Sequence, residues 1–469
     1  MPPRSRLRLA ALALLGLALG TLTTSAQPLP PDPTGQTFRN PILPAGQDPS
    51  VVFDGALYHL VQSDEDGIGI RTSPTLTGLG DVKKVVVWRG GQSDSPCCEL
   101  WAPELVRMDG KWYIYYAADD GRNENHRMYV LESDRVTGPY TFRGQITDPT
   151  NRWAIDGTVF QGPDGRRYFV WSGWEGTENV QQNLYVAPMK NAWTLAGERV
   201  KISEPDQPWE RIGQPYINEG PEVLVRGGRT FIVYSASGSW TDDYCLGLLS
   251  LTGKNVLDPA AWKKSNGCVF ARNDAASVYA PGHGGFVKSA DGTEDWHLYH
   301  AIEVQGASWG GRSIRAQEFT WKADGTPNFG RPASFDTALP LPSGEYEAEQ
   351  ARLNGVQVQE EPLASGGRAA RLDGPGDSVN FARVRAPRDG TYTLRVRYSN
   401  GSGKVARQSV TVNGTSTDVT YPPSGWSNFG TRPVSVRLRA GENDVRFMQE
   451  AGAVQLDAVT VTPGAVASP

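Results

Sequence analysis

The chain has 469 residues, which at about 150 residues per domain is enough for two or three domains. Its 53 glycines and 34 prolines, together with 14 Trp, 17 Tyr and 14 Phe, are typical of a globular protein rich in strands and turns, and they argue against a helical bundle. The formal net charge of −5 leaves no broad basic surface to hold a polyanion, so nucleic acid is excluded as an expected partner.

The first 26 residues have the features of a secretory signal peptide. Three arginines within the first eight residues precede an apolar run over residues 9–19, and the small residues Thr24-Ser25-Ala26 follow as a cleavage site. The apolar run is shorter than the roughly 20 residues of a membrane-spanning helix. We therefore expect a secreted, extracellular protein with no membrane partner, with an uncleaved membrane anchor as the alternative.

Four cysteines allow three disulfide pairings in an exported chain: Cys97, Cys98, Cys245 and Cys268. A Cys245–Cys268 bridge would close a loop of 23 residues, which the chain-entropy model values at roughly 3 kcal/mol. The adjacent Cys97 and Cys98 would form a strained ring if they were joined to each other. We favour the Cys245–Cys268 bridge, and no cysteine spacing fits a zinc site.

A repeated pattern runs through residues 37–340. Each copy has a short β-rich run, an Asp-Gly or Gly-Gly turn and a second β-rich run, which is typical of a hairpin whose tight turn needs positive φ. The copies begin every 54 to 64 residues, at Asp48, Ala102, Asp156, Gly220 and His283. These spacings favour an all-β fold, with a five-bladed β-propeller over residues 37–340. The heads of the copies should then converge on one funnel around the axis.

Three carboxylates stand at these heads: Asp48, Asp156 and Glu219, the last of them one residue before its copy begins. Glycoside hydrolysis uses one protonated carboxyl group to donate to the leaving oxygen and one carboxylate to activate water or attack the sugar. A third acid can raise the pKa of the donor by like-charge repulsion. The pattern predicts a sugar-hydrolysing site. The alternative is that each acid only accepts backbone N–H bonds in a turn, but the agreement across copies favours the site.

Several ordered motifs in this region resemble family 43 glycoside hydrolases, over about 300 residues. They are Asn40-Pro41 to Asp48-Pro49, Trp101-Ala102-Pro103-Glu104-Leu105, Ile155-Asp156-Gly157, Asn218-Glu219-Gly220-Pro221-Glu222 and Pro281-Gly282-His283. Residues 244–249, 315–321 and 324–327 are similar to the α-L-arabinofuranosidase members in particular. The resemblance implies a five-bladed propeller and an inverting mechanism. It also implies Asp48 as general base, Glu219 as general acid, and Asp156 as the residue that orients the acid and raises its pKa.

Three other residues of this region are candidates for the funnel. Trp101 precedes the second head and is expected to form a wall against a sugar face, with core packing as the alternative. The resemblance implies that His283 holds a central ion or water, whereas a lone histidine is often structural. Arg315 is expected to hydrogen-bond a carboxylate or a sugar hydroxyl; Arg312 is a close competitor, and either arginine could instead form a surface ion pair of little energetic worth.

Residues 344–463 form a second domain after the linker-like segment 340–344. Alternating runs such as residues 392–398 and 434–438 favour a β-sandwich, jelly-roll-like in type. Segments 345–349, 390–392, 441–443 and 456–457 resemble carbohydrate-binding modules of the family 35 and family 6 types. The resemblance implies that Glu347, Glu349 and Asp457 ligate a structural calcium, whose preference is for carboxylate oxygens; the alternative is that they are ordinary solvated acids.

Trp426 is the only tryptophan after Trp321, and Pro and Gly around it indicate a loop within residues 421–429. An aromatic ring on a loop is well placed to stack on a sugar, and the competing interpretation is that it fills the end of the sandwich core.

These observations predict a secreted enzyme that removes α-L-arabinofuranosyl units from plant cell-wall arabinan or arabinoxylan and that carries a sugar-binding sandwich. Rivals of the same fold are a β-xylosidase and an arabinanase. Rivals of other classes are a non-catalytic sugar-binding propeller and a structural surface protein assembled through its sandwich.

Overall fold

The computed structural model describes residues 35–65 and 67–464, and the predicted signal peptide lies outside the described residues. The described part consists of strands, loops and short 3-10 turns without an α-helix, which confirms the all-β prediction. In the same residues, no helix has the length and apolar character needed to cross a membrane. The 3-10 turns are η1 (Thr77–Leu79), η2 (Gln92–Asp94), η3 (Asn123–Asn125), η4 (Pro208–Glu210), η5 (Pro259–Ala261), η6 (Asp274–Ala276), η7 (Ala348–Gln350) and η8 (Ser365–Gly367).

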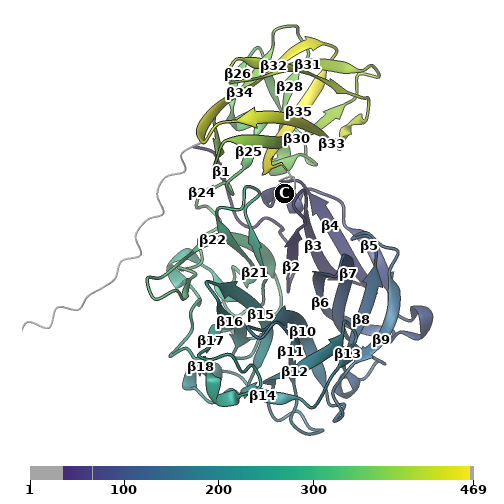
Figure 1. Ribbon diagram of the computed structural model, residues 1–469, viewed down its shortest axis with the longest axis vertical. Helices are drawn as coiled ribbons and strands as arrows, with labels where there is room; N and C mark the ends of the chain where they lie inside the picture. The colour runs from purple at the N-terminus through teal and green to yellow at the C-terminus, as the bar shows by residue number, and fades with distance from the viewer. Residues whose placement is uncertain (1–34, 66, 465–469) are drawn as a thin grey trace, which may run out of the picture. The chain divides into compact units, whose positions relative to one another are not determined.

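The described residues between 50 and 328 form five antiparallel sheets in chain order (Figure 1). The first contains β2 (Ser50–Phe53), β3 (Tyr58–Asp64), β4 (Gly67–Ser73) and β5 (Val85–Arg89), and the second β6 (Cys98–Met108), β7 (Lys111–Asp119), β8 (Arg127–Ser133) and β9 (Thr141–Ile146). The third contains β10 (Ala154–Gln161), β11 (Arg167–Gly173), β12 (Asn183–Asn191), β13 (Thr194–Leu195) and β14 (Val200–Ser203). The fourth contains β15 (Asn218–Arg226), β16 (Arg229–Ala236), β17 (Cys245–Leu251) and β18 (Trp262–Lys264), and the fifth β19 (Tyr279–Gly282), β20 (Phe286–Lys288), β21 (Asp295–Ile302), β22 (Ser313–Trp321) and β23 (Pro327–Asn328).

The repeat copies fold as the predicted hairpins. In the second copy, Asp109 and Gly110 join β6 to β7 with φ of 52° and 80°, and in the fourth copy Gly227 and Gly228 join β15 to β16 with φ of 57° and 75°. Two consecutive positive φ values suit the right-handed twist of the flanking strands. This conformation explains why Asp-Gly and Gly-Gly stand at these turns.

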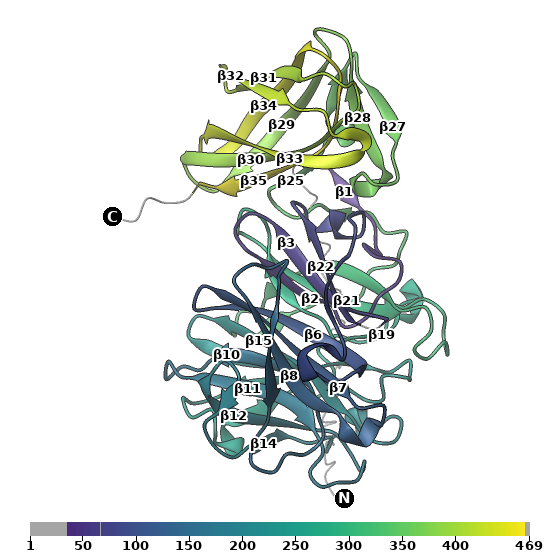
Figure 2. The ribbon, with the colours of Figure 1, turned by 90° about the vertical axis from the view of Figure 1, so that its right-hand side faces the viewer.

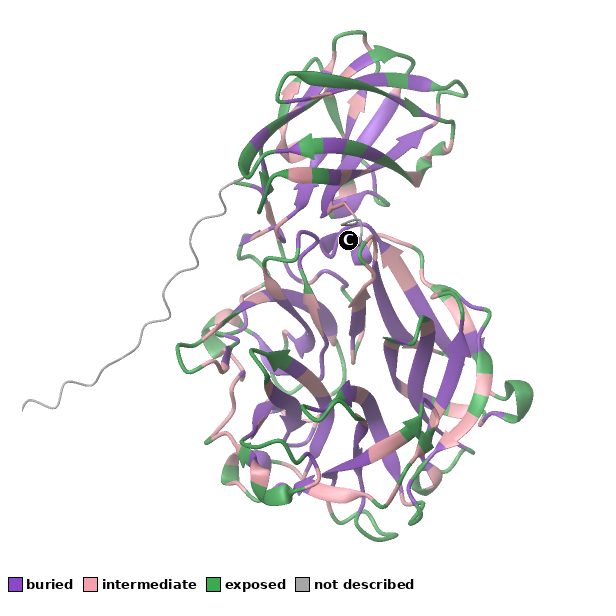
Figure 3. Cartoon of the chain, viewed as in Figure 1, coloured by how far each residue is buried: buried purple, intermediate pink, exposed green. Residues whose placement is uncertain are grey.

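Neighbouring sheets share apolar cores. Val61 and Ile70 of the first sheet lie in one buried cluster with Ile114 of the second, and Leu60 of the first lies in another with Leu298 of the fifth. The second and third, third and fourth, and fourth and fifth sheets are joined in the same way. Because both faces of each sheet are covered, central strands such as β7 are buried along nearly their whole length (Figure 3).

Short pairings and two disulfides complete this part of the chain. Strand β1 (Thr37–Phe38) pairs with β24 (Leu339–Pro340), so the first and last residues of the predicted 37–340 domain lie side by side. The favoured Cys245–Cys268 disulfide is present. Cys97 and Cys98 are also joined to each other, although the sequence analysis had not favoured a bridge between adjacent cysteines.

The C-terminal domain is a sandwich of two antiparallel sheets, seen in Figure 2 as two stacked layers. One sheet contains β25 (Glu345–Glu347), β27 (Gln357–Glu360), β28 (Arg368–Leu372), β30 (Gly390–Asn400), β33 (Gly425–Leu438) and β35 (Val454–Pro463). The other contains β26 (Arg352–Asn354), β29 (Ser378–Ala386), β31 (Ala406–Val412), β32 (Thr415–Tyr421) and β34 (Gly441–Ala451). In β33, Val434, Val436 and Leu438 are buried while the residues between them are exposed, which is the predicted alternation.

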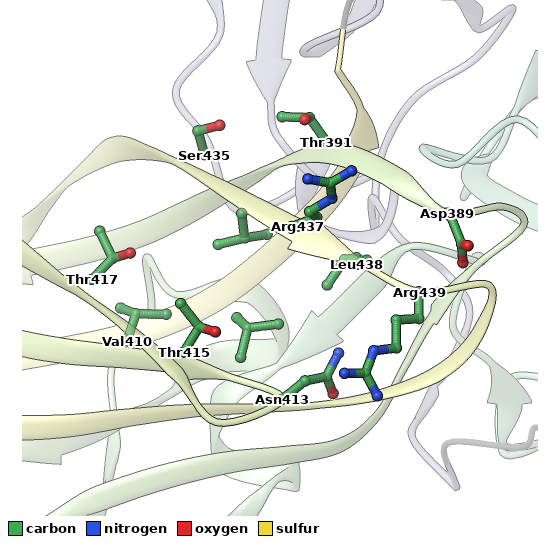
Figure 4. Close-up of a pocket in the computed structure, with 12 residues that line it drawn as sticks. Asp389, Thr391, Val410, Asn413, Thr415, Thr417, Ser435, Arg437, Leu438 and Arg439 are labelled. Atoms are coloured by element: carbon green, nitrogen blue, oxygen red, sulfur yellow. The ribbon is translucent and has the colours of Figure 1, made fainter.

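A cavity of about 510 Å³ lies beside the edge strands of the two sheets of the sandwich (Figure 4). Val410 and Val412 of β31 contribute apolar side chains, and Thr417, Ser435 and Arg437 contribute polar ones. Among the residues that the structure describes, no aromatic side chain lines this cavity and offers a flat apolar surface on which a sugar ring could stack.

Candidate active site

Four of the heads, Asp48, Ala102, Asp156 and His283, line one pocket of about 520 Å³ together with Glu219, the residue before the fourth head. The backbone at each head takes the left-handed conformation, with φ of 47° at Asp48, 39° at Ala102, 56° at Asp156, 52° at Gly220 and 34° at His283. Four of these residues are not glycine, so this backbone conformation costs free energy. Strained backbone of this kind is frequent at functional sites. The register of the strand pairs shifts beside the second, third and fourth heads. The predicted convergence of the heads is therefore confirmed.

Asp48 stands just before β2 and faces two histidines. Its Oδ1 lies 3.3 Å from Nδ1 of His283 and 3.1 Å from Nδ1 of His300. Burial alone would raise the pKa of Asp48, but His283, the hydrogen bond and charge of His300, and the charge of Arg312 together hold this pKa well below its usual range. Asp48 is thus an anion at neutral pH and can accept a proton from water.

Glu219 lies near the start of β15, and its carboxyl group is buried. The Tyr244 hydroxyl donates a hydrogen bond of 2.8 Å to Oε1 of Glu219. Burial is the main cause that raises the pKa of Glu219 to about 7; the charge of Asp48 adds to it, while the Tyr244 hydrogen bond and Arg312 oppose it. Glu219 can therefore carry a proton at neutral pH, which a general acid requires.

Asp156 lies within β10 and is buried beside the same groups. Its Oδ2 accepts a 3.0 Å hydrogen bond from the backbone N–H of Gly220, the residue after Glu219, and lies 3.9 Å from Nδ1 of His283. Burial, followed by the charges of Glu219 and Asp48, raises the pKa of Asp156 well above its ordinary value. Asp156 thus holds the backbone next to Glu219, and charge interaction links these two carboxyl groups.

Trp101 contributes one wall of the pocket and is half-buried. Its Nε1–H donates to Oε2 of Glu99 at 2.8 Å, and its ring stacks on His126 at a centroid distance of 4.0 Å. Trp101 therefore packs against His126 and also lines the pocket, and its predicted contact with a sugar face stays a prediction.

Arg315 hydrogen-bonds a carboxylate, as expected from the sequence, but it does not line the pocket in which the sequence had placed it. Its side chain is fully buried on β22, donating to Oε1 of Glu303 at 2.6 Å and to the carbonyl of Ala333 at 3.2 Å. The competitor, Arg312, lines the pocket instead. The physical reason is position: Arg312 precedes β22 and lines the cavity, whereas Arg315 lies inside the strand and donates to Glu303 and Ala333.

Trp426 lies in the second position of β33 and not in a loop, which corrects the sequence interpretation. β33 is an edge strand, where a proline such as the one it contains is tolerated. The ring is half-buried outside the main apolar core, with the guanidinium of Arg371 4.1 Å from its centroid and Gly401 close against it. Trp426 is thus partly covered by neighbours of its own module.

The three predicted calcium ligands lie near one another in the sandwich. Oε1 of Glu347 accepts from the hydroxyl of Ser365 at 2.7 Å, and Asp457 accepts from the backbone N–H of Ser365 at 2.8 Å and pairs with Arg397. Burial first, and then the charges of Asp457 and Glu349, raise the pKa of Glu347, while the pKa of Glu349 rises to about 7 through burial and the charge of Asp457.

The fit of these residues to a cation is mixed. Oε2 of Glu347 and Oε2 of Glu349 are buried without a hydrogen-bond partner in the described part of the chain, which is how carboxylates are left when a cation is their partner. Among the same residues, however, no group of three or more His, Cys, Asp or Glu takes an arrangement that could hold a metal ion. His283 belongs to the catalytic pocket, and its predicted role toward an ion stays a prediction.

Sequence reasoning missed several residues that shape the pocket. Tyr244 and His300 contact the acids, and Trp240 and Trp309 line the cavity. His300 lies on β21 opposite Gly282, one residue before the fifth head, so strand pairing is the signal that could have found it. Tyr244 precedes β17, and nothing in the sequence ties it to Glu219.

A pocket that holds one carboxylate with a depressed pKa and another with a raised pKa fits the base and acid pair of a glycoside hydrolase. Residues 38–327 match the glycosyl hydrolases family 43, and residues 344–464 match the carbohydrate binding module family 35. The chain belongs to glycosyl hydrolase family 43.

Named relatives agree with this assignment. The chain is 37% identical over 357 residues to an extracellular exo-α-(1→5)-L-arabinofuranosidase of Streptomyces avermitilis, covering 73% of each chain. It is 34% identical over 392 residues to α-L-arabinofuranosidase 43 of Humicola insolens, covering 76% of this chain and 79% of that one. The crystal structure of an α-L-arabinofuranosidase from Lactobacillus brevis superposes with a TM-score of 0.59 at 34% identity, over 64% of this chain and 98% of that chain.

Proposed function

We propose that the protein releases α-L-arabinofuranosyl units from arabinan or arabinoxylan with inversion at the anomeric carbon. The observation that carries the proposal is the opposite perturbation of Asp48 and Glu219 within one pocket. The identity of the released sugar is proposed from the named arabinofuranosidases to which the chain is similar.

In the proposed mechanism, Asp48 takes a proton from a water molecule as the water oxygen attacks the anomeric carbon. Glu219 gives its proton to the glycosidic oxygen as the bond from that oxygen to the anomeric carbon breaks. Asp156 keeps the backbone beside Glu219 in place through the N–H of Gly220. The products are arabinose and a shortened chain with a free hydroxyl group.

Digestion of linear arabinan, branched arabinan and arabinoxylan, with chromatographic identification of the products, tests this function. Release of arabinose supports it, xylose would identify a β-xylosidase, and a ladder of arabino-oligosaccharides an arabinanase. No release from any glycan would favour a non-catalytic sugar-binding propeller, and no sugar affinity in either domain would favour a structural surface protein. A Glu219→Gln variant should lose release of arabinose from natural glycosides.

The five sheets are proposed to be the blades of a five-bladed β-propeller. Support comes from their order along the chain and from the apolar core that the first sheet shares with the fifth. A crystal structure showing the sheets arranged around one axis, with the catalytic pocket on that axis, would test the proposal.

The sandwich is proposed to bind plant cell-wall polysaccharide and to hold a structural calcium through Glu347, Glu349 and Asp457. The two unpartnered carboxylate oxygens support the calcium proposal. Calcium bound to the folded state alone stabilises it by about 2.7 kcal/mol at a concentration 100 times its Kd. A chelator should therefore lower the melting temperature of the full chain, and identical melting with and without chelator would contradict the proposal.

The protein is proposed to be secreted after cleavage of residues 1–26. The S. avermitilis relative is named as extracellular, which supports the proposal. N-terminal sequencing of protein from the culture medium should give a chain that begins at Gln27.

A further inference from the structure

Trp309 is a large apolar side chain held in solvent at the catalytic pocket. It is 60% exposed, and among the exposed large apolar side chains of the described residues it is the one that lines this pocket. An indole ring left mostly in water gains little from the fold itself. The exposure of Trp309 at the pocket therefore suggests that its ring is covered when a ligand binds.

Two neighbouring side chains contact the ring of Trp309. Its Nε1–H donates to Oγ of Ser239 at 3.1 Å, and its edge meets the ring of Trp240 at 79° and 6.1 Å. The loop that carries Trp309 is tied to the same neighbouring segment by the guanidinium of Arg312, which donates to the carbonyl of Ser239 at 3.0 Å. The N–H of Gly306 donates to Oδ1 of Asp242 at 2.9 Å. A pre-positioned ring loses little conformational entropy when a ligand covers it.

The position of Trp309 indicates which part of the substrate its ring faces. Glu219 is 8% exposed and Trp309 is 60% exposed, so the ring lies toward the open side of the pocket that both residues line. Under the proposed function, the released sugar lies at the buried acid, and the part of the polysaccharide that leaves extends toward solvent and therefore toward Trp309. The terminal arabinose occupies the buried end of the pocket, beside Asp48 and Glu219.

We propose that Trp309 is a stacking platform for the sugar unit on the leaving-group side of the scissile bond, and so a specificity-determining residue for oligomeric and polymeric substrates. This inference rests on the proposed arabinofuranosidase function. The flat ring meets the apolar C–H face of a sugar, as aromatic side chains do in binding sites. The platform adds nothing to the binding of a single arabinose.

The test compares a substrate that reaches the platform with a sugar that does not. In the full chain, Trp309→Ala should lower kcat/KM on α-1,5-linked arabinotriose by about tenfold or more, while the inhibition constant of free L-arabinose stays within about twofold. Trp309→Phe should recover a large part of the activity, because it restores a flat ring. Val304→Ala is the matched control, since Val304 lies on the same loop, is 68% exposed and does not line the pocket.

The outcomes separate the inference from the function on which it rests. A wild-type protein that releases no arabinose from arabinotriose overturns the proposed function. An active wild type with Trp309→Ala unchanged on arabinotriose overturns the platform. Equal weakening of arabinose inhibition and of arabinotriose hydrolysis also overturns it, because the ring would then shape the buried sugar site. Melting temperatures within about 1 °C of wild type are expected for an exposed residue.

Discussion

The hydrogen bond from Tyr244 to Glu219 should set the pH above which the enzyme loses activity. The hydroxyl lies 2.8 Å from the carboxyl oxygen of the proposed general acid, and this bond lowers the pKa of Glu219. Burial raises the pKa of Tyr244 itself, so its hydroxyl stays protonated and donates. Tyr244→Phe removes the donor and keeps the ring that stacks on His300.

The size of the effect follows from the charge of the acceptor. A hydrogen bond to a charged group contributes about 1.5–3 kcal/mol, and one to a neutral group about 0.5–1.5 kcal/mol. The difference of about 1–1.5 kcal/mol favours the ionised form of Glu219 and corresponds to about one pH unit at 1.36 kcal/mol per unit. Without the bond, the pKa of Glu219 rises from about 7. The acid then keeps its proton to higher pH, so the alkaline limb moves upward by about one pH unit.

The assay is the pH dependence of kcat/KM on an arabino-oligosaccharide, whose leaving alcohol needs a proton. Tyr234→Phe is a matched control, because Tyr234 is also fully buried and donates at 2.8 Å to a buried carboxylate, that of Glu210, which does not line the pocket. Tyr234→Phe removes a similar buried hydrogen bond, and the alkaline limb of its pH profile should stay in place. An alkaline limb that stays or falls in Tyr244→Phe would refute the reasoning.

Three further predictions concern the chemistry and the sandwich. Asp156→Ala should lower the rate on natural glycosides, because it removes the carboxyl oxygen that accepts the backbone N–H of Gly220 beside Glu219; an unchanged rate would contradict this positioning role. An inverting reaction needs a water between carboxyl groups roughly 6.5 to 9.5 Å apart, so NMR should detect first the anomer opposite to that of the substrate, and initial release of the same anomer would contradict the roles of Asp48 and Glu219. Trp426→Ala should weaken retention in polysaccharide affinity gels with little change in melting temperature, because the ring lies outside the main apolar core. A loss of roughly 3–5 kcal/mol of stability without a change in retention would instead make Trp426 a core residue.

Much of the catalytic centre was readable from the amino-acid sequence because the fold repeats itself. Hairpin turns need Asp-Gly or Gly-Gly, and these turns mark where each copy lies. Once the copies are aligned, Asp48 and Asp156 stand at matching places and Glu219 one residue before the matching place, and structural repetition brings these places together. The alternation in β33 likewise predicted which residues face the core of the sandwich.

Only the tertiary structure decided which other side chains reach the acids. Tyr244 and His300 come from strands and loops far along the chain, and a hydrogen bond across such a separation leaves no local pattern. The choice between Arg312 and Arg315 depended on where β22 begins, because a shift of a few residues decides whether an arginine faces the pocket or internal partners. The pKa difference between Asp48 and Glu219 also arises from burial and from charges of remote residues, which residue identity alone does not specify.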